Sequence, residues 1–299
     1  MLKVGIVGFG MMGRQIAQVF AQHENEVSVT DENHESLGLG MDEIENGPYG
    51  LKAAVARGKL STTDSSTVLS RIKTVVHLKD ACAHADLVIE AVYEDPDLKQ
   101  RVFQEIDSSA PPTALLASNT STLTLTKIAA KVKRKERVLG MHFFNPAQAT
   151  KLVEVIHSRE TAPETIQRGL EIIKLIGKTP ILAKDEPGFI ANRLGLTLFQ
   201  EASRLLEDEI ASINDIDNAM KLGYGHPMGP FQTADLVGLD TRLRNLESLF
   251  HATGDQKWLP SKALREMVNQ GYLGDPSKRR GSKGGYYQFF RIEPRTEPP

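Results

Sequence analysis

A histidine and a glutamate on two successive strand-like segments are the residues of this chain best suited to acid–base chemistry. His142 lies in the segment MHFFNP, residues 141–146, and Glu154 lies in the apolar segment LVEVI, residues 152–156. An imidazole takes up a proton near neutral pH, and a neighbouring carboxylate stabilises the imidazolium that forms. The pair therefore predicts proton transfer, with a purely structural histidine at a strand end as the alternative.

The N-terminal segment has the pattern of a dinucleotide-binding turn. The strand-like run KVGIV, residues 3–7, leads into GFGMMG, residues 8–13, and then into apolar residues at helical spacing. In such a motif the first glycine makes the tight turn, the second lets the backbone approach a pyrophosphate, and the third packs the helix on the strand. The alternative is a glycine turn in an unrelated α/β sheet. The loop residues expected to contact the dinucleotide are Gly8, Gly10, Met11, Met12 and Gly13.

Acidic residues after the next strand-like run favour NAD as this dinucleotide. Residues 27–30, VSVT, are followed directly by Asp31 and Glu32. Asp31 is placed to accept hydrogen bonds from the ribose of the adenosine, and both carboxylates would repel the 2′-phosphate of NADP. The sequence therefore predicts NAD binding.

Length and composition indicate a globular chain of about two domains. The chain has 299 residues, and its 36 basic and 38 acidic residues give a net charge of −2, so nucleic acid is not an expected partner. The single cysteine, Cys82, excludes an internal disulfide and has no metal-ligand spacing around it, so we expect a cytoplasmic protein without a metal site. No apolar run approaches about 18 residues, so no membrane span is expected.

Strand-like runs alternate with helical segments until Pro187 and Gly188 break the chain, and only helical patterns follow. A mostly polar helical insertion, about residues 35–73, is interrupted by breakers at residues 45–50. We predict a Rossmann-like, doubly wound and largely parallel α/β sheet over residues 1–184 and an all-α substrate and dimerisation domain over residues 185–299. The later strand-like runs are residues 74–76, 86–91, 114–118, 138–141, 152–156 and 180–183.

Six ordered motifs resemble those of the 3-hydroxyacyl-CoA dehydrogenases of the short-chain, 3-hydroxybutyryl-CoA type, over nearly the whole chain. The tail departs from the family pattern, because residues 278–287, KRRGSKGGYY, contain extra residues, and no cofactor-contacting lysine is assigned there. The motifs are GFGMMG at 8–13, EAVYE at 90–94, SNTS at 118–121, HFFNP at 142–146, PGFIANR at 187–193, and PMGPF at 227–231 before GLD at 238–240.

The resemblance implies a catalytic set of His142, Glu154, Ser121 and Asn192. His142 would take the proton of the 3-hydroxyl of an acyl-CoA while the C3 hydride passes to NAD, and Glu154 would orient His142. Ser121, in the first residues of a helix, and Asn192 would hold the substrate oxygen in a cleft between the domains. The structural alternatives are a helix cap for Ser121, an edge-strand position for Glu154 and a surface position for Asn192.

The same resemblance implies further contacts and a homodimer formed through the helical domain. Four residues would contact NAD, namely Glu94, Lys99, Asn119 and Asn145. For Glu94 and Lys99 the alternative is an ion pair on a helix surface. Three basic residues of the insertion are candidates for the phosphates of coenzyme A, with a solvated helix face as the alternative: Lys52, Arg57 and Lys59.

The leading functional hypothesis is reversible, NAD-dependent oxidation of a (3S)-3-hydroxyacyl-CoA, short-chain such as 3-hydroxybutyryl-CoA, to the 3-oxoacyl-CoA. One alternative is an NAD-dependent dehydrogenase of a free hydroxy acid, similar to gulonate dehydrogenase. Another is a non-catalytic protein, similar to the lens crystallins recruited from this family. Acyl length, pathway and direction are left open.

Overall fold

The computed structural model describes residues 1–293 of the chain. The chain forms two compact units, Met1–Phe189 and Ile190–Pro299. The sequence pattern predicts the boundary between residues 184 and 185. The division falls a few residues later because the turn after the last strand still packs on the first unit, where Phe189 joins a buried cluster with Leu125, Ile156 and Ala183.

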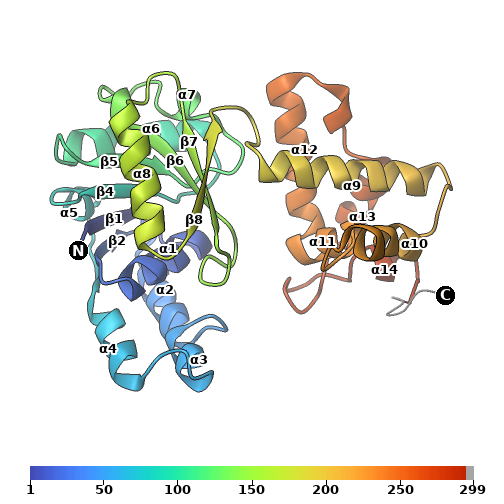
Figure 1. The fold of residues 1–299 in the computed structure, drawn as a ribbon, viewed down its shortest axis with the longest axis horizontal. Coiled ribbons are helices and arrows are strands. Elements are labelled where there is room, and N and C mark those ends of the chain that lie inside the picture. The colour runs from blue at the N-terminus through green and yellow to red at the C-terminus, as the bar shows by residue number, and fades with distance from the viewer. Residues whose placement is uncertain (294–299) are drawn as a thin grey trace. The chain divides into compact units, whose positions relative to one another are not determined.

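The first unit is built on one eight-stranded sheet of order β3-β2-β1-β4-β5-β6-β7-β8. All neighbouring strands are parallel except β6 and β7, which are antiparallel, so the predicted doubly wound, largely parallel sheet is confirmed. The strands are β1 Lys3–Val7, β2 Glu26–Thr30, β3 Ile72–Thr74, β4 Leu87–Glu90, β5 Leu115–Ser118, β6 Val138–Phe143, β7 Leu152–His157 and β8 Thr179–Lys184 (Figure 1).

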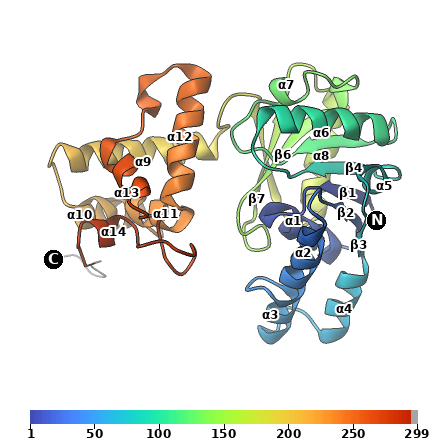
Figure 2. The same cartoon turned by 180° about the vertical axis from the view of Figure 1, so that it is seen from behind.

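Helices cover both faces of this sheet because neighbouring strand residues point to opposite sides. Ile89 of β4 belongs to the core with the helices α1 and α8, whereas Val88 packs with Phe103 of α6. The helix α8 lies in front of the sheet in Figure 1, and α6 lies in front of it in Figure 2. The helices are α1 Met11–Gln22, α5 Leu78–Cys82, α6 Pro96–Ser109, α7 Leu125–Ile128 and α8 Pro163–Leu175, with a 3₁₀ turn at Lys135–Arg137.

The predicted insertion after β2 contains the helices α2 His34–Asn46, α3 Leu51–Ala56 and α4 Thr62–Ser70. The breakers recognised in the sequence form the turn between α2 and α3, where the Gly50 N–H donates to the Gly47 carbonyl at 2.8 Å. Ser61 starts α4 by accepting a hydrogen bond from the Asp64 N–H at 3.0 Å. These three helices lie at the edge of the sheet unit, beside β2 and β3 (Figure 2).

The second unit is helical, as the sequence predicts. Its core is aromatic and aliphatic, with Phe199, Phe231, Trp258 and Tyr286 buried together. Ser212 caps α10 through the Asp215 N–H at 3.2 Å, as its capping-box pattern indicates. The elements are α9 Ala191–Glu207, α10 Ile213–Asn218, a π-helical segment Ala219–Gly223, α11 Pro230–Val237, α12 Leu239–Thr253, a 3₁₀ turn Gln256–Trp258, α13 Lys262–Asn269 and α14 Tyr286–Phe289.

Candidate active site

The antiparallel pairing of β6 and β7 brings His142 and Glu154 directly opposite each other. The imidazole Nδ1 and a Glu154 carboxylate oxygen lie 2.6 Å apart. Glu154 is fully buried and His142 is 5% exposed. A buried carboxylate at this distance fixes Nδ1 as the protonated nitrogen and leaves Nε2 as the proton acceptor. An edge-strand position for Glu154 is excluded, because β7 lies between β6 and β8.

Aromatic rings cover the His142 imidazole. The ring of Phe144 lies 4.4 Å from it and that of Phe189 lies 5.9 Å from it, measured between centroids. Such apolar neighbours limit water around the imidazole and strengthen its interaction with Glu154.

Ser121 lies in an irregular segment between β5 and α7, and not in the first residues of a helix as the sequence analysis expected. The N–H groups of this segment donate to a side chain and not to helical carbonyls: Glu94 Oε1 accepts from Ser121 at 3.0 Å and from Thr122 at 3.1 Å. Thr120 Oγ1 also donates to this oxygen, at 2.6 Å, and accepts from the Leu123 N–H at 3.0 Å. The helix-cap alternative for Ser121 is wrong, because the next helix, α7, starts at Leu125 and has Thr124 as its N-cap.

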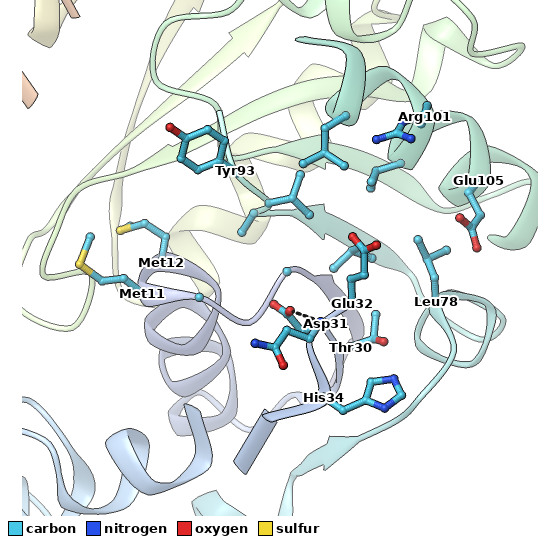
Figure 3. A pocket seen from close by; sticks show the side chains of 18 of the residues that line it. Met11, Met12, Thr30, Asp31, Glu32, His34, Leu78, Tyr93, Arg101 and Glu105 are labelled. Carbon is cyan, nitrogen blue, oxygen red and sulfur yellow. Dashed lines mark hydrogen bonds between the residues drawn. The ribbon is translucent and has the colours of Figure 1, made fainter. Parts of the chain in front are cut away.

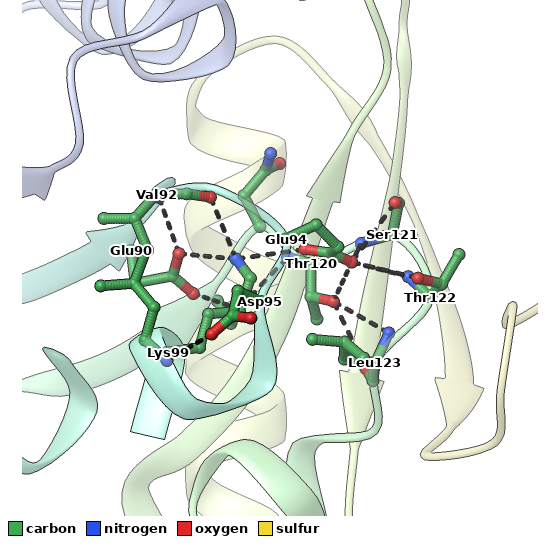
Figure 4. A network of polar contacts seen from close by, with 12 residues as sticks. Glu90, Val92, Glu94, Asp95, Lys99, Thr120, Ser121, Thr122 and Leu123 are labelled. Atoms are coloured by element: carbon green, nitrogen blue, oxygen red, sulfur yellow. Dashed lines mark hydrogen bonds and ion pairs between the residues drawn. The ribbon is translucent and has the colours of Figure 1, made fainter. Parts of the chain in front are cut away.

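Lys99 is buried, so the alternative of an ion pair on a helix surface is wrong for it. Its side chain is 1% exposed, and its ammonium lies 2.6 Å from Glu90 and 3.2 Å from Glu94 (Figure 4). It also donates to the Val92 carbonyl at 3.3 Å. The ammonium is therefore enclosed by protein groups, and any influence on a cofactor passes through Glu94 or Val92, which line the neighbouring pocket.

Burial and the neighbouring charges shift the pKa values of Glu90, Glu94 and Lys99 in opposite directions. Burial raises the pKa of Glu90 above its ordinary value, and the nearby Lys99 offsets this only in part. Burial also disfavours the charges of Glu94 and Lys99, but here their partners prevail. The pKa of Glu94 is lowered by Lys99 and by hydrogen bonds from Thr120, Ser121 and Thr122, and the pKa of Lys99 is raised by Glu90 and Glu94.

Two of the three positions of the glycine motif require glycine. Gly8 has a φ of 95°, and a Cβ there would lie 2.7 Å from the backbone of Ala91. A Cβ at Gly13 would clash with the Gly8 carbonyl oxygen, so the third glycine lets α1 pack against the turn. Around Gly10, in contrast, a Cβ would meet no atom within 4 Å. Gly10 is the N-cap of α1 without a side-chain cap, so a phosphate fits this helix end.

A pocket of about 1390 Å³ lies at the carboxyl ends of β1, β2 and β4, where the strand order reverses. Asp31 lies on one wall, with its carboxylate accepting from the N–H groups of Phe9 at 2.6 Å and Asn33 at 2.9 Å. Tyr93 and Arg101 lie on the wall opposite Asp31 and Glu32 (Figure 3). An open helix end beside an acidic strand end fits the pyrophosphate and adenosine ribose of NAD.

Asn119 and Asn145 form hydrogen bonds with segments next to His142. Asn119 Oδ1 accepts from the Phe143 N–H at 2.9 Å, which ties the end of β5 to the end of β6. Asn145 Oδ1 accepts from Gln15 Nε2 of α1 at 2.9 Å, and Gln15 Oε1 accepts from the Ala147 N–H at 2.7 Å. Both asparagines therefore position the backbone that carries His142.

Asn192 is the second residue of α9, in the helical unit. The three basic candidates for coenzyme A are all exposed in the α2–α3 region. Lys52 pairs with Glu45 at 2.9 Å, and Arg57 donates to the Pro48 carbonyl at 3.1 Å. These contacts hold the turn between α2 and α3, and Lys59 follows α3 on the same exposed hairpin.

Several residues around the site are not predicted by the sequence motifs. Glu90 is part of a motif without an assigned role, although it ends β4, where open α/β sheets bind ligands. Other pocket residues lie in the loops after β3 and β4, at the start of α5 and along α6, and a rule based on strand ends finds only those in the loops: Val76, Leu78, Tyr93, Arg101 and Glu105. Within residues 1–293, no group of three or more His, Cys, Asp or Glu side chains could hold a metal ion. No helix of this range is long and apolar enough to cross a bilayer.

Two family models match the chain in succession. The NAD-binding domain of 3-hydroxyacyl-CoA dehydrogenase matches residues 3–186, and the C-terminal domain of 3-hydroxyacyl-CoA dehydrogenase matches residues 188–284. A protein of Deinococcus radiodurans named "Probable 3-hydroxybutyryl-CoA dehydrogenase" is 40% identical over 96% of this chain and 100% of its own length. The 3-hydroxybutyryl-CoA dehydrogenase of Clostridioides difficile is 35% identical over 96% of this chain and 99% of its own length.

Solved structures share the whole fold. The crystal structure of 3-hydroxybutyryl-CoA dehydrogenase from Escherichia coli K12 has a TM-score of 0.90 and 37% identity over 99% of this chain, which spans 61% of that longer chain. The (S)-3-hydroxybutyryl-CoA dehydrogenase from Ralstonia eutropha has a TM-score of 0.86 and 37% identity over 94% of this chain and 99% of its own.

Proposed function

Because the chain belongs to the 3-hydroxyacyl-CoA dehydrogenase family, we propose that it catalyses the reversible, NAD-dependent oxidation of a (3S)-3-hydroxyacyl-CoA to the 3-oxoacyl-CoA. The names of its relatives support a short-chain substrate such as 3-hydroxybutyryl-CoA. The observation that carries the mechanism is the buried contact of 2.6 Å between His142 and Glu154.

His142 is the general base of the proposed reaction. Its Nε2 accepts the proton of the substrate 3-hydroxyl, and Glu154 stabilises the imidazolium that results. Bound NAD⁺ supplies the acceptor for the hydride that leaves C3. In the reverse direction the imidazolium returns the proton to the 3-oxo oxygen, and afterwards the base equilibrates with solvent.

Ser121 and Asn192 complete the proposed site by hydrogen bonding to the substrate oxygen. Glu94 holds the backbone N–H of Ser121, and Asn192 is the second residue of α9. Neutral donors suit this task, because the oxygen gains and loses negative character while the proton and the hydride are transferred.

The proposed cofactor contacts follow the pocket at the strand ends. Five residues at the N-terminus of α1 would hold the pyrophosphate, namely Gly8, Gly10, Met11, Met12 and Gly13, and Asp31 would bind the adenosine ribose. Glu94, Asn119 and Asn145 would also contact NAD, and Lys99 would contribute by holding Glu94. Three exposed basic residues of the α2–α3 hairpin are proposed for the phosphates of coenzyme A: Lys52, Arg57 and Lys59.

The proposed enzyme is a cytoplasmic homodimer that associates through its helical unit. Large apolar side chains of this unit are strongly exposed, among them Leu194 at 68%, Leu222 at 63% and Tyr224 at 78%. Exposed apolar area of this kind favours association. Light scattering during size-exclusion chromatography tests the dimer, and a Leu194→Glu variant of monomeric mass would locate the interface.

The test of the proposed function is the oxidation of NADH by acetoacetyl-CoA, measured beside NADPH and beside free acetoacetate. We expect turnover of the thioester with NADH only. Turnover of free acetoacetate in place of the thioester would instead support the dehydrogenase of a free hydroxy acid. A folded protein that turns over no short, long or branched 3-oxoacyl-CoA would support the non-catalytic alternative.

A further inference from the structure

A buried lysine, Lys99, lies between two glutamates of the sheet unit, Glu90 and Glu94. Lys99 and Glu90 are 1% and 0% exposed. Burying such charges costs several kcal/mol of desolvation, and hydrophobic residues of similar size would fill the space at less cost. A role in the site explains why charged groups occupy it.

Glu94 connects this lysine to the segment that carries Ser121. Its Oε2 lies 3.2 Å from the Lys99 ammonium, while its Oε1 receives the N–H groups of Ser121 and Thr122 at 3.0 and 3.1 Å. Figure 4 shows the ammonium on one side of this carboxylate and the segment on the other. The Glu94 side chain is 33% exposed, so without the ammonium it could rotate into solvent and release both N–H groups.

Glu90 supports the same segment by a second route. Its Oε1 accepts from Lys99 at 2.6 Å and from the Val92 N–H at 2.7 Å. Its Oε2 accepts from Ser118 Oγ at 2.6 Å, and Ser118 Oγ accepts from the Thr120 N–H at 3.2 Å. The end of β4, the first turn of α6 and the segment after β5 are therefore joined in a closed ring of charge-assisted hydrogen bonds.

We propose that Lys99 and Glu90 are positioning residues that act through Glu94 to hold the Ser121 segment in its reactive geometry. This inference rests on the proposed function for the role of Ser121. The charge balance supports it, because Lys99 keeps Glu94 ionised and therefore able to accept from both N–H groups at once.

The variants Lys99→Met and Glu90→Gln test the proposal, and Asp107→Asn is the matched control. Asp107 pairs with Arg134 at 2.7 Å in the same unit, between α6 and the turn after α7, outside the pocket. We expect Lys99→Met to lower kcat about 10- to 100-fold, the effect of a misplaced group in the site. The KM for acetoacetyl-CoA and the Kd for NADH should change by less than about threefold. Glu90→Gln keeps the shape and should act in the same direction more weakly, and Asp107→Asn should lower Tm with kcat unchanged.

A double-mutant cycle with Ser121→Ala separates positioning from a general loss of stability. If Lys99 acts through Ser121, Lys99→Met should lower kcat by less than about twofold in the Ser121→Ala background, because the group that it positions is gone. The full effect in that background would overturn the proposal. So would a loss of NADH affinity that accounts for the whole defect, since that result would assign Lys99 to the cofactor.

Amide hydrogen exchange gives a readout that does not depend on the substrate. We expect the Ser121 and Thr122 N–H groups to exchange at least about tenfold faster in Lys99→Met, and unchanged in Asp107→Asn. If exchange is faster in Lys99→Met but the wild type turns over no acyl-CoA, the positioning of the Ser121 segment by Lys99 is supported and the proposed function is refuted. Unchanged exchange would refute the positioning, whatever the wild-type activity.

Discussion

The two units of this chain bury ionisable groups in different ways. In the sheet unit each buried carboxylate of the site faces a basic group, as Glu154 faces His142 and Glu90 faces Lys99. In the helical unit Asp217, 1% exposed, accepts only neutral donors among the described residues, namely the N–H groups of Phe231 and Gln232 and the hydroxyl of Tyr287. The sheet unit thus uses paired charges to orient reacting groups, whereas the helical unit uses carboxylates as helix caps.

The difference extends to the basic residues. Lys99 has two carboxylates within 3.2 Å, but Arg242 of α12 has no carboxylate partner among residues 1–293 and lies over the ring of Phe199 at 5.8 Å. Burial lowers the pKa of Arg242 to about 10. The two carboxylates raise the pKa of Lys99 in spite of its burial, whereas no carboxylate offsets the effect of burial on Arg242.

Breaking the catalytic pair should have the largest effect. His142→Ala should lower kcat by about 10²- to 10⁴-fold, because no other group takes the proton of the 3-hydroxyl. His157→Ala is the matched control at the end of β7, where His157 Nδ1 lies 3.2 Å from the Ser158 carbonyl oxygen, and its kcat should equal that of wild type. Steady-state NADH oxidation measures both. Equal activity of His142→Ala and wild type would assign His142 to the fold alone.

Breaking the Lys99 pair should cost stability as well as positioning. Lys99→Met should lower the free energy of unfolding by about 3–5 kcal/mol, because it leaves buried carboxylates without a counter-charge. The double variant Glu90→Gln/Lys99→Met should recover part of this loss. Urea denaturation measures the three proteins. A double variant less stable than the single one would show that the pair is not the source of the loss.

Removing Arg242, which has no carboxylate partner among residues 1–293, should raise the free energy of unfolding. Arg242→Met keeps an unbranched side chain on Phe199 and removes a buried Nε that has no hydrogen-bond partner, so we expect a gain of about 1 kcal/mol in unfolding free energy. Thermal unfolding at several protein concentrations measures it. A loss that grows on dilution would mean that a second copy of the chain supplies the missing carboxylate.

The smallest effect is expected from Asp235, which caps α14 through the Tyr286 N–H at 2.9 Å. Burial, with the nearby Asp217 and Asp275 charges, raises its pKa from 3.8 to about 7. A raised pKa means that the folded state favours the protonated form, so this contribution to stability is full below 3.8 and is lost as the pH rises to about 7.

Asp235→Asn keeps the accepting oxygen and cannot ionise, so it should remove this pH dependence. The variant should match wild type near pH 4 and exceed it by about 1 kcal/mol above pH 7. Chemical denaturation across this pH range measures the difference, with exposed Asp208→Asn as the control. A constant difference at all pH values would assign the effect to the cap and not to ionisation.

Much of the fold follows from local patterns in the sequence. The glycine motif predicted β1, the turn and α1, because such a turn depends on a few adjacent residues. The helical insertion and its interruption were also predicted, from breakers that form the Gly47–Gly50 turn. Errors arose where distant groups decide local structure. Ser121 was expected in a helix, but a carboxylate from another loop holds its segment in an irregular form.

The family motifs, the alternation of strands and helices, and the residues available for proton transfer and dinucleotide binding can all be read from the amino-acid sequence. Which of these groups meet depends on the packing of the folded chain. The register of β6 on β7 places His142 opposite Glu154, and the packing of α6 beside β4 and β5 encloses Lys99 between Glu90 and Glu94. The reason is physical: propensities and turn residues act over a few positions, whereas the partner of a buried charge is set by contacts between segments far apart in the chain.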